Sequence, residues 1–182
     1  MSANDLAIRA AALADAPAIA ALHVAVWRAT YRDLAPPEAV RVLDVSTREK
    51  RWVEMLAKAE RTVLVAERDG RIVGIGTAGA ATVPEFRGHG EILYLYVDPM
   101  HGRGGIGRAL MHNLAQTLQK QGYRSAALGV VIGNQPAIDF YRKLGGRLAG
   151  TYIDPGPQWR SRNQIIVWDD IETLLSSSRR PE

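Results

Sequence analysis

The sequence feature that most constrains the fold is a strand that runs into a glycine-rich turn and then into a helix. The strand is expected at residues 91–97, and the turn after it contains Gly102, Gly104, Gly105 and Gly107. Glycines at the start of a helix leave backbone N–H groups uncovered, and these groups attract anions together with the helix dipole. We therefore predict that a phosphate-bearing ligand binds at this turn.

The charges around the turn favour the same ligand. No Asp or Glu occurs from Pro99 to Ile138, and all charged residues of this stretch are basic: Arg103, Arg108, Lys120 and Arg124. An ordinary solvated basic face is the alternative. We prefer the anion site because the glycines and the positive charge coincide at one helix start.

Two other phosphate-binding motifs differ from this turn in their context. The glycines at 102, 104 and 107 match G-x-G-x-x-G, but a dinucleotide-binding fold carries that motif in its first strand-to-helix turn, with an acidic residue about twenty positions later. Here about ninety residues precede the turn, and the acid-free stretch covers the position of that acidic residue. No Gly-Lys-Ser/Thr follows the glycines, which excludes a Walker-type loop.

Composition limits the remaining classes of protein. The chain has 182 residues, 47% of them hydrophobic, which predicts a single domain at 1–175 and a frayed tail at 176–182. It contains no cysteine, no apolar run long enough for a membrane span and no signal-peptide pattern, and we expect a cytoplasmic protein that binds no membrane. The net charge of +4 comes without a long basic run, and the histidines lack metal-ligand spacing, so we expect neither nucleic acid nor metal as a ligand.

Hydrophobic periodicity predicts alternating strands and helices. Strands are expected at 6–10, 62–67, 71–78, 91–97, 125–132, 147–153 and 164–168. Helices are expected after Asp15, at 47–59, between Gly104 and Gly122, at 134–144 and around 171–175. Asp69-Gly70 is a hairpin signal, whereas the segments with Pro36-Pro37 and 82–90 are expected to be loops. The apolar strand 125–132 is expected to be parallel, and the last two strands antiparallel.

Two segments resemble the GCN5-related N-acetyltransferase (GNAT) family. Val97 to Leu110 is similar to the family's acetyl-CoA motif, R/Q-x-x-G-x-G/A, and Asn134 to Gly145 is similar to its N-x-x-A-x-x-x-Y-x-x-x-G helix. The resemblance implies an α+β, three-layer fold in which a mixed, mostly antiparallel central sheet of about seven strands carries helices on both faces. One position departs from the motif: Gly102 stands where the family has Arg or Gln, and arginine is displaced to Arg103.

The resemblance implies that acetyl-CoA is the co-substrate. The main chain of Leu95, Tyr96 and Val97 would pair with its pantetheine arm, and Asn134 would lie near the thioester. Backbone N–H groups of the turn would hold the pyrophosphate. The implied turn residues are Arg103, Gly104, Gly105, Ile106, Gly107 and Arg108.

The resemblance also implies a catalytic role for Tyr141, which would protonate the departing thiolate of CoA. A tyrosine hydroxyl with a pKa of about 10 stays protonated at neutral pH. The acceptor amine must lose a proton, which costs about 4 kcal/mol for a lysine-like amine, so a carboxylate base is expected. Glu91 is the first candidate and Glu85 the second, while Gly129 occupies a position where some members have a glutamate.

The face that Glu91 presents depends on the regularity of its strand. Simple alternation places Glu91 on the same face as Leu95 and Val97, opposite Tyr94 and Tyr96, whereas a bulge would change the face.

The acceptor is the least constrained part of the prediction. The run from Trp27 to Tyr31 at the end of the first helix resembles a subset of the family that acetylates polyamines and other small amines. Together with Glu85, these aromatic residues would suit a cationic primary amine, which would take the acetyl group in a ternary complex. Ordinary packing of the two aromatic residues is the alternative. Other functions left open are a non-catalytic acyl-CoA sensor or structural module, and a protein N-terminal or lysine acetyltransferase. A homodimer fits the resemblance, although no sequence feature requires one.

Overall fold

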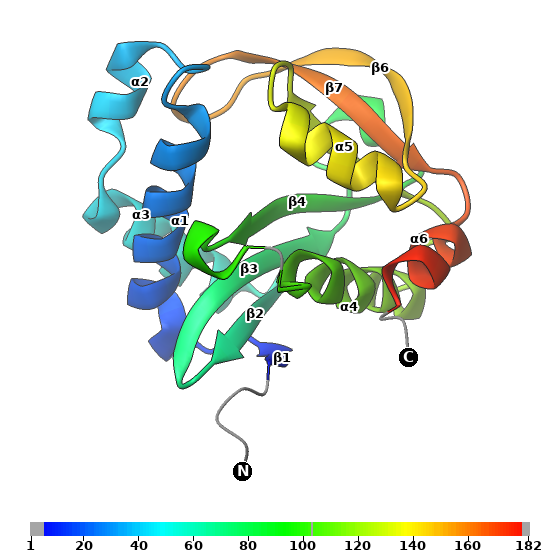
Figure 1. The fold of residues 1–182 in the computed structure, drawn as a ribbon, viewed down its shortest axis with the longest axis horizontal. Coiled ribbons are helices and arrows are strands. Elements are labelled where there is room, and N and C mark those ends of the chain that lie inside the picture. Colours follow the sequence, from blue (N-terminus) through cyan, green and yellow to red (C-terminus); the bar gives the residue numbers. More distant parts are fainter. Residues whose placement is uncertain (1–5, 103, 180–182) are drawn as a thin grey trace.

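The computed structural model, which describes residues 6–102 and 104–179, is built around a seven-stranded sheet with strand order β1-β2-β3-β4-β5-β7-β6 (Figure 1). The strands are β1 (Ala7–Ala10), β2 (Thr62–Arg68), β3 (Arg71–Gly79), β4 (Gly90–Val97), β5 (Ala126–Val131), β6 (Arg147–Asp154) and β7 (Ser161–Trp168). All neighbouring strands are antiparallel except β4 and β5, which run parallel. The predicted mixed, mostly antiparallel sheet is therefore confirmed.

Helices cover both faces of this sheet (Figure 1). They are α1 (Ala16–Tyr31), α2 (Pro37–Val42), α3 (Val45–Lys58), α4 (Ile106–Lys120), α5 (Gln135–Lys143) and α6 (Ile171–Ser178), with 3-10 turns η1 (Leu13–Asp15), η2 (Pro84–Phe86) and η3 (Pro99–His101). Helices α1 and α3 pack on one face, where they bury Ile19 and Trp52 against the sheet, and α2 packs on α1 through Ala39. The other three share a second core with the opposite face, around Leu110 and Leu114 of α4.

The hairpin between β2 and β3 follows directly from its turn residues. Asp69 and Gly70 both have positive φ, 52° and 71°, as a two-residue type I′ turn requires. The predicted hairpin is confirmed, with Arg68 paired to Arg71 at its end.

Two segments differ from the sequence prediction. Residues 37–42 form α2 rather than a loop, because a proline at the first helical position has a suitable φ and needs no N–H partner there. Helix α6 runs to Ser178, so residues 176–178 belong to the helix rather than to a frayed tail. Ser178 is only 1% exposed, which shows that the end of this helix is packed against the domain.

Helix α4 lies close to the sheet because glycines face it. A Cβ atom at Gly76 would lie 2.7 Å from Leu114 Cδ1, and one at Gly90 would lie 2.6 Å from Leu118 Cδ2. Side chains at these positions would push the helix outward, since protein cores have little free volume. The glycines therefore allow α4 to begin immediately beside the end of β4.

Strands β4 and β5 separate after a short shared segment. Their pairing consists of Gly90 with Ala126 and Glu91 with Ala127. The residues of β4 beyond this point pair only with β3, so their main chain on the β5 side stays free of sheet hydrogen bonds. The two strands thus open a gap in the middle of the sheet.

A bulge in β4 changes which face its residues occupy. Tyr94 pairs with Thr77 but Ile92 pairs with Ala78, so Leu93 is an extra residue in the ladder. Ile92 packs in the α4 core, whereas Glu91 points to the opposite face, toward Arg61. The alternation that placed Glu91 with Leu95 and Val97 is therefore wrong, and the bulge is the reason.

None of the helices within residues 6–102 and 104–179 combines the length and the apolar character needed to cross a membrane.

The close packing of α4 yields a stability prediction. Gly76→Ala should lower the free energy of unfolding by about 2 kcal/mol, because the added methyl group overlaps Leu114. In a Leu114→Val background the same substitution should cost clearly less, since the conflicting Cδ1 atom is absent. Urea unfolding of the four proteins measures both values, and equal costs in the two backgrounds would contradict the proposed contact.

Candidate functional site

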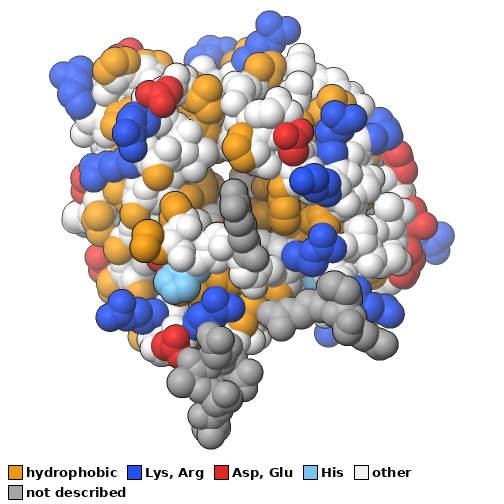
Figure 2. Space-filling model, viewed as in Figure 1, with side chains coloured by type: hydrophobic (Ala, Val, Ile, Leu, Met, Phe, Trp, Pro, Cys, Tyr) orange, Lys and Arg blue, Asp and Glu red, His pale blue; other side chains and the backbone are white. Residues whose placement is uncertain are grey.

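A cleft of about 740 Å³ lies where β4 and β5 separate, between the start of α4 and one side of α5. Its walls include the end of β4 (93–97), the first turn of α4 and the exposed edge of α5, and we call it the main cleft. Figure 2 shows a hollow at the centre of this face, with apolar side chains inside it and Lys and Arg side chains nearby. The cleft therefore has an apolar interior and a basic surrounding.

The first turn of α4 presents bare amides to the main cleft. Gly105 precedes the helix with a φ of 74°, and a Cβ there would meet no atom within 4 Å. The first hydrogen bond of the helix runs from Ala109 N–H to Gly105 O, at 2.9 Å. The amides of 106–108 consequently have no partner within the helix, and they form the kind of N-terminal site that holds phosphate.

Most of the predicted cofactor residues are brought together here. The residues that line the main cleft are Leu95, Tyr96, Val97, Gly105, Ile106, Gly107, Arg108 and Asn134. Gly104 is not among them and lies against the Arg68 guanidinium, and Arg103 is outside the described residues. The guanidinium of Arg108 donates to Ser177 O of α6, which holds this side chain toward α6 and leaves the backbone amide of Arg108 free for a ligand.

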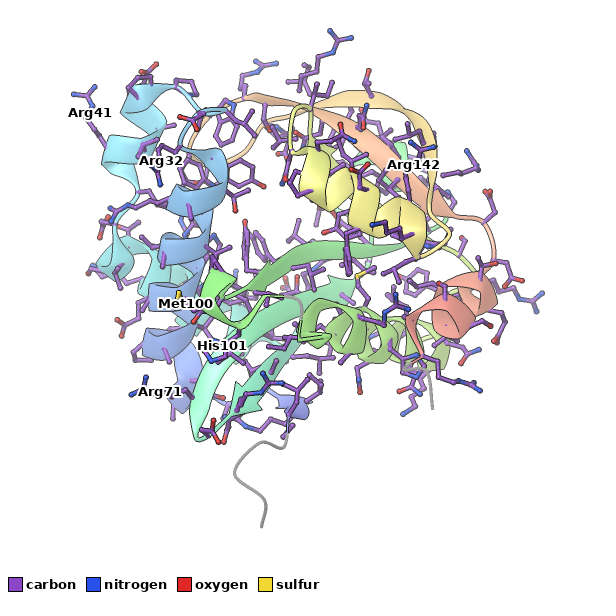
Figure 3. The ribbon with its side chains drawn as sticks, viewed as in Figure 1. Arg32, Arg41, Arg71, Met100, His101 and Arg142 are labelled. Atoms are coloured by element: carbon purple, nitrogen blue, oxygen red, sulfur yellow. The ribbon has the colours of Figure 1, made fainter. Side chains whose placement is uncertain are left out.

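The main cleft also contains residues that sequence reasoning missed. Phe140 and Lys143 of α5 line it, as does His101 of η3, which lies beside the glycine turn in Figure 3. His101 Nδ1 is 3.1 Å from the Asp98 carboxylate. The helical spacing of Pro136, Phe140 and Lys143 was the available signal, because it places them along one side of α5.

A second, smaller cavity of about 220 Å³ opens on the other side of β4, and we call it the side pocket. It shares Leu93, Tyr94, Tyr96, Gly129 and Tyr31 with the main cleft. Its remaining lining is His23, Trp27, Arg48, Val131, Asp154, Gly156, Pro157, Gln158, Trp159, Ser161 and Asn163. The two cavities thus meet in the gap between β4 and β5.

Trp27 and Tyr31 both line the side pocket and pack against neighbours. Their rings lie 5.2 Å apart, and Trp159 contacts Trp27 at 5.4 Å and Tyr31 at 5.6 Å between ring centroids. These are ordinary distances for aromatic pairs. Trp27 and Tyr31 therefore pack against their aromatic neighbours and line the side pocket at the same time.

His23 presents a neutral ring to the side pocket. Burial, with a further contribution from Arg48, lowers the pKa of His23 to about 3. Trp52 Nε1–H donates to His23 Nδ1 at 3.2 Å, so the ring proton is on Nε2. His23 therefore has a donor available for a ligand but no free acceptor nitrogen.

Neither predicted base reaches the two cavities. Glu91 is 2% exposed and accepts hydrogen bonds from Thr82 N–H at 2.8 Å, Thr82 Oγ1 at 2.9 Å and Arg61 Nη2 at 3.2 Å. Glu85 is exposed on η2. Among the described residues that line the two cavities, Asp154 alone carries a carboxylate side chain, and no local sequence signal identified it.

Asp154 lies at the end of β6 and is held in place by two donors. Gly156 N–H donates to Oδ1 at 2.8 Å, and Asn163 Nδ2 donates to Oδ2 at 3.3 Å. The hydroxyl of Tyr152, on the same strand, occupies the space that a side chain at Gly129 would need. A glutamate on β5 at this position would therefore clash with Tyr152.

Tyr141 lines the main cleft from α5, packed between Phe140 and Trp168 at ring distances of 5.3 and 6.2 Å. Burial, and the nearby Tyr31, raise the pKa of the Tyr141 hydroxyl above its usual value. Burial also raises the pKa of Tyr31 to about 12; Asn134 offsets part of this rise and Asp154 adds to it. Both hydroxyls are thus protonated at neutral pH and remain available as donors.

The Asn134 side chain caps α5 by accepting from Ala137 N–H at 3.4 Å. Within residues 6–102 and 104–179, no group of three His, Cys, Asp or Glu side chains is arranged to hold a metal ion.

Residues 24–146 match the model of the acetyltransferase (GNAT) family. The chain is 31% identical over 136 residues to the uncharacterized N-acetyltransferase YuaI of Bacillus subtilis, covering 74% of this chain and 76% of that protein. It is 28% identical over 161 residues to the L-methionine sulfoximine/L-methionine sulfone acetyltransferase of Pseudomonas paraeruginosa, covering 84% and 86% of the two chains.

Solved structures show the same fold. The PaiA N-acetyltransferase of Thermoplasma acidophilum, in complex with coenzyme A, has a TM-score of 0.71 at 17% identity and covers 90% of this chain and 98% of its own. The ribosomal-protein-alanine N-acetyltransferase of Brucella melitensis has a TM-score of 0.68 at 29% identity and covers 89% and 98%.

The contacts of Glu91 predict a structural role for this residue. Glu91→Gln should lower the free energy of unfolding by about 3 kcal/mol, because the buried guanidinium of Arg61 loses its counter-ion. Asp169→Asn, which removes the exposed partner of Arg147, is the matched control and should change stability little. Urea unfolding measures both variants. A Glu91→Gln protein of unchanged stability would contradict this role.

Proposed function

This chain belongs to the acetyltransferase (GNAT) family, and from that premise we propose that it transfers the acetyl group of acetyl-CoA to the primary amine of a small molecule. The family and the relatives named N-acetyltransferases make it an acetyl-CoA-dependent acyltransferase. The observation that carries the proposal is the junction of the two cavities between β4 and β5. Two reactants bound in these cavities would meet there and react without a covalent enzyme intermediate.

The main cleft fits coenzyme A. Its bare amides at 106–108 suit the pyrophosphate, and the free main chain of 95–97 suits the amide groups of the pantetheine arm. Bound acetyl-CoA would supply an acetyl group activated as a thioester. The PaiA structure, which has the same fold, was solved with coenzyme A, and this supports the proposed use of the cleft.

The side pocket supports a small acceptor. Its volume of about 220 Å³ matches a small molecule better than an extended peptide, and a relative at 28% identity is named for L-methionine sulfoximine and sulfone. The second candidate is acetylation of a protein N-terminus, which the likeness to the ribosomal-protein-alanine N-acetyltransferase favours. A peptide acceptor in the experiment below separates the two.

We propose that Asp154 removes the proton from the acceptor amine. An amine of ordinary pKa is charged at neutral pH, and it must be neutral before it can attack a carbonyl carbon. Asp154 is the carboxylate in the side pocket, so it would orient the ammonium group and take its proton directly or through water. Glu91 and Glu85 do not line either cavity, and their roles as base and acceptor residue stay predictions without geometric support.

Tyr141 is the proposed acid. Its hydroxyl stays protonated because burial raises the pKa, and it lines the main cleft beside Asn134. From there it would give its proton to the thiolate that leaves when the acetyl group is transferred. The expected cytoplasmic location and homodimer stay predictions from the sequence.

The bare amides of α4 give a binding prediction. Gly105→Asp should weaken CoA binding about 100-fold relative to Gly105→Asn, because the two side chains tolerate positive φ alike and only Asp brings a negative charge to the phosphate site. Gly122→Asp is the control for strain, since Gly122 also has positive φ and open space, at the other end of α4. Isothermal calorimetry measures all three, and equal affinities for Gly105→Asp and Gly105→Asn would contradict the anion site.

The acetyl-transfer function is tested by thiol release from acetyl-CoA over a panel of amino acids, polyamines, aromatic amines and a peptide with N-terminal alanine. Wild-type protein should acetylate a small amine and leave the peptide unchanged. Tyr141→Phe and Asp154→Asn should each lower kcat/KM about 100-fold at pH 7. Tyr123→Phe is the control and should be fully active, because Tyr123 lies between α4 and β5 and lines neither cavity. Peptide acetylation would favour the second candidate, and CoA binding without acetylation of any amine would indicate a non-catalytic binder.

A further inference from the structure

Arg48 is a buried cation in the side pocket with no carboxylate of the described residues within 4 Å, and we propose that it binds a carboxylate of the acceptor, so that the acceptor is an amino acid or a close analogue. This inference rests on the acetyl-transfer function proposed above and names its substrate class. The observations that carry it are the burial of Arg48, the groups around it and the position of Asp154 in the same pocket.

Within the part of the chain that the structure describes, Arg48 lacks the paired carboxylate that a buried guanidinium normally has, and Asp44 at the start of the same helix acts on it only from a distance. Arg48 lies on α3 and lines the side pocket, and it is only 4% exposed. No carboxylate of the described residues lies within 4 Å of it, nor does its guanidinium donate a hydrogen bond to any of them. By contrast, Arg61, which is similarly buried, pairs with Glu91 at 3.2 Å. The Arg48 guanidinium nitrogens are not among the fully buried atoms without a partner, so they face the side pocket, where a bound anion would pair with the charge.

The groups around Arg48 are hydrogen-bond donors. His23 has its free proton on Nε2, because Nδ1 is occupied by Trp52. Burial raises the pKa of Tyr94 and Tyr96, so their hydroxyls stay protonated beside Arg48. A cation surrounded by neutral donors can satisfy both oxygens of a carboxylate, whereas a second ammonium group would be repelled.

Asp154 and Tyr31 lie toward the other end of the same pocket. Asp154 ends β6, next to the loop whose Trp159 contacts Tyr31, and Tyr31 lines both cavities. Arg48 instead lies one turn before Trp52 on α3, and Trp52 contacts His23, about two turns before Tyr31 on α1. The amine of an amino acid would therefore face Asp154 and the thioester while its carboxylate faces Arg48. A polyamine, which the sequence favoured, would place a cation against Arg48.

Kinetics with matched acceptors tests the carboxylate directly. Each of the common L-amino acids is compared with its carboxamide and with its decarboxylated amine in the thiol-release assay. Wild-type kcat/KM should be at least about 100-fold higher for the best amino acid than for its two derivatives, mainly through KM. Arg48→Met should remove this preference without changing the Kd for CoA, and Arg48→Lys should keep part of it.

Thermal unfolding provides a readout that does not depend on turnover. The wild-type Tm should rise with 4-methylpentanoate, an amino-acid analogue without the amine, but not with 4-methylpentanamide. Arg48→Met should abolish the rise and, without ligand, should have a Tm equal to or above wild type, because it removes an unpaired charge. Arg61→Met is the matched control and should lower the Tm, because Glu91 loses its partner.

The outcomes separate the two proposals. Acetylation of amines without any preference for a carboxylate, or a preference for polyamines, overturns the role of Arg48 and leaves the acetyl-transfer function standing. A Tm rise with 4-methylpentanoate that depends on Arg48, without acetylation of any amine, supports the anion site while the proposed function fails. If Arg48→Met lowers the Tm as much as Arg61→Met does, Arg48 is a structural residue and the inference is wrong.

Discussion

The separation of β4 from β5 after two paired residues is the constraint on which the rest of the site depends. It frees the main chain at the end of β4 and opens the main cleft on one face of the sheet and the side pocket on the other. A continuous sheet would satisfy those backbone groups internally and would leave no passage between the cavities. The gap therefore allows an acyl donor on one face to meet an amine acceptor on the other.

Packing around the gap keeps its two sides in place. Glycines of β3 and β4 let α4 lie close to the sheet, so that its bare amides come immediately after the end of β4. Arg108 ties the same turn of α4 to the end of α6 through Ser177 O. On the opposite face, the buried Arg61–Glu91 pair holds the start of β4 next to Thr82. Stability and the proposed function thus depend on different residues of β4: Glu91 anchors the start of the strand, and the last residues of the strand line the cavities.

Local sequence patterns were enough to predict the parts of the site that depend on backbone geometry. The glycine turn and the helix after it, and the helix from Asn134 to Tyr141, are encoded by contiguous residues, and their positions in the structure agree with the prediction. The face of Glu91 was left open between simple alternation and a bulge, and local periodicity could not decide because one extra residue, Leu93, inverts the alternation. Arg48 and Asp154 were missed for another reason: they come from α3 and β6, distant in sequence, and only the packing of these elements around β4 brings both into one pocket.

Amide hydrogen exchange of the full chain with and without CoA is the most direct measurement of the central claim, that the gap beside β4 seats the cofactor. The account predicts slower exchange in the presence of CoA at residues 94–97 and 105–108, with β1 and β2 unchanged, because the ligand would occupy the free amides of β4 and α4. Unchanged exchange at both segments in a protein saturated with CoA, with protection appearing elsewhere, would contradict it.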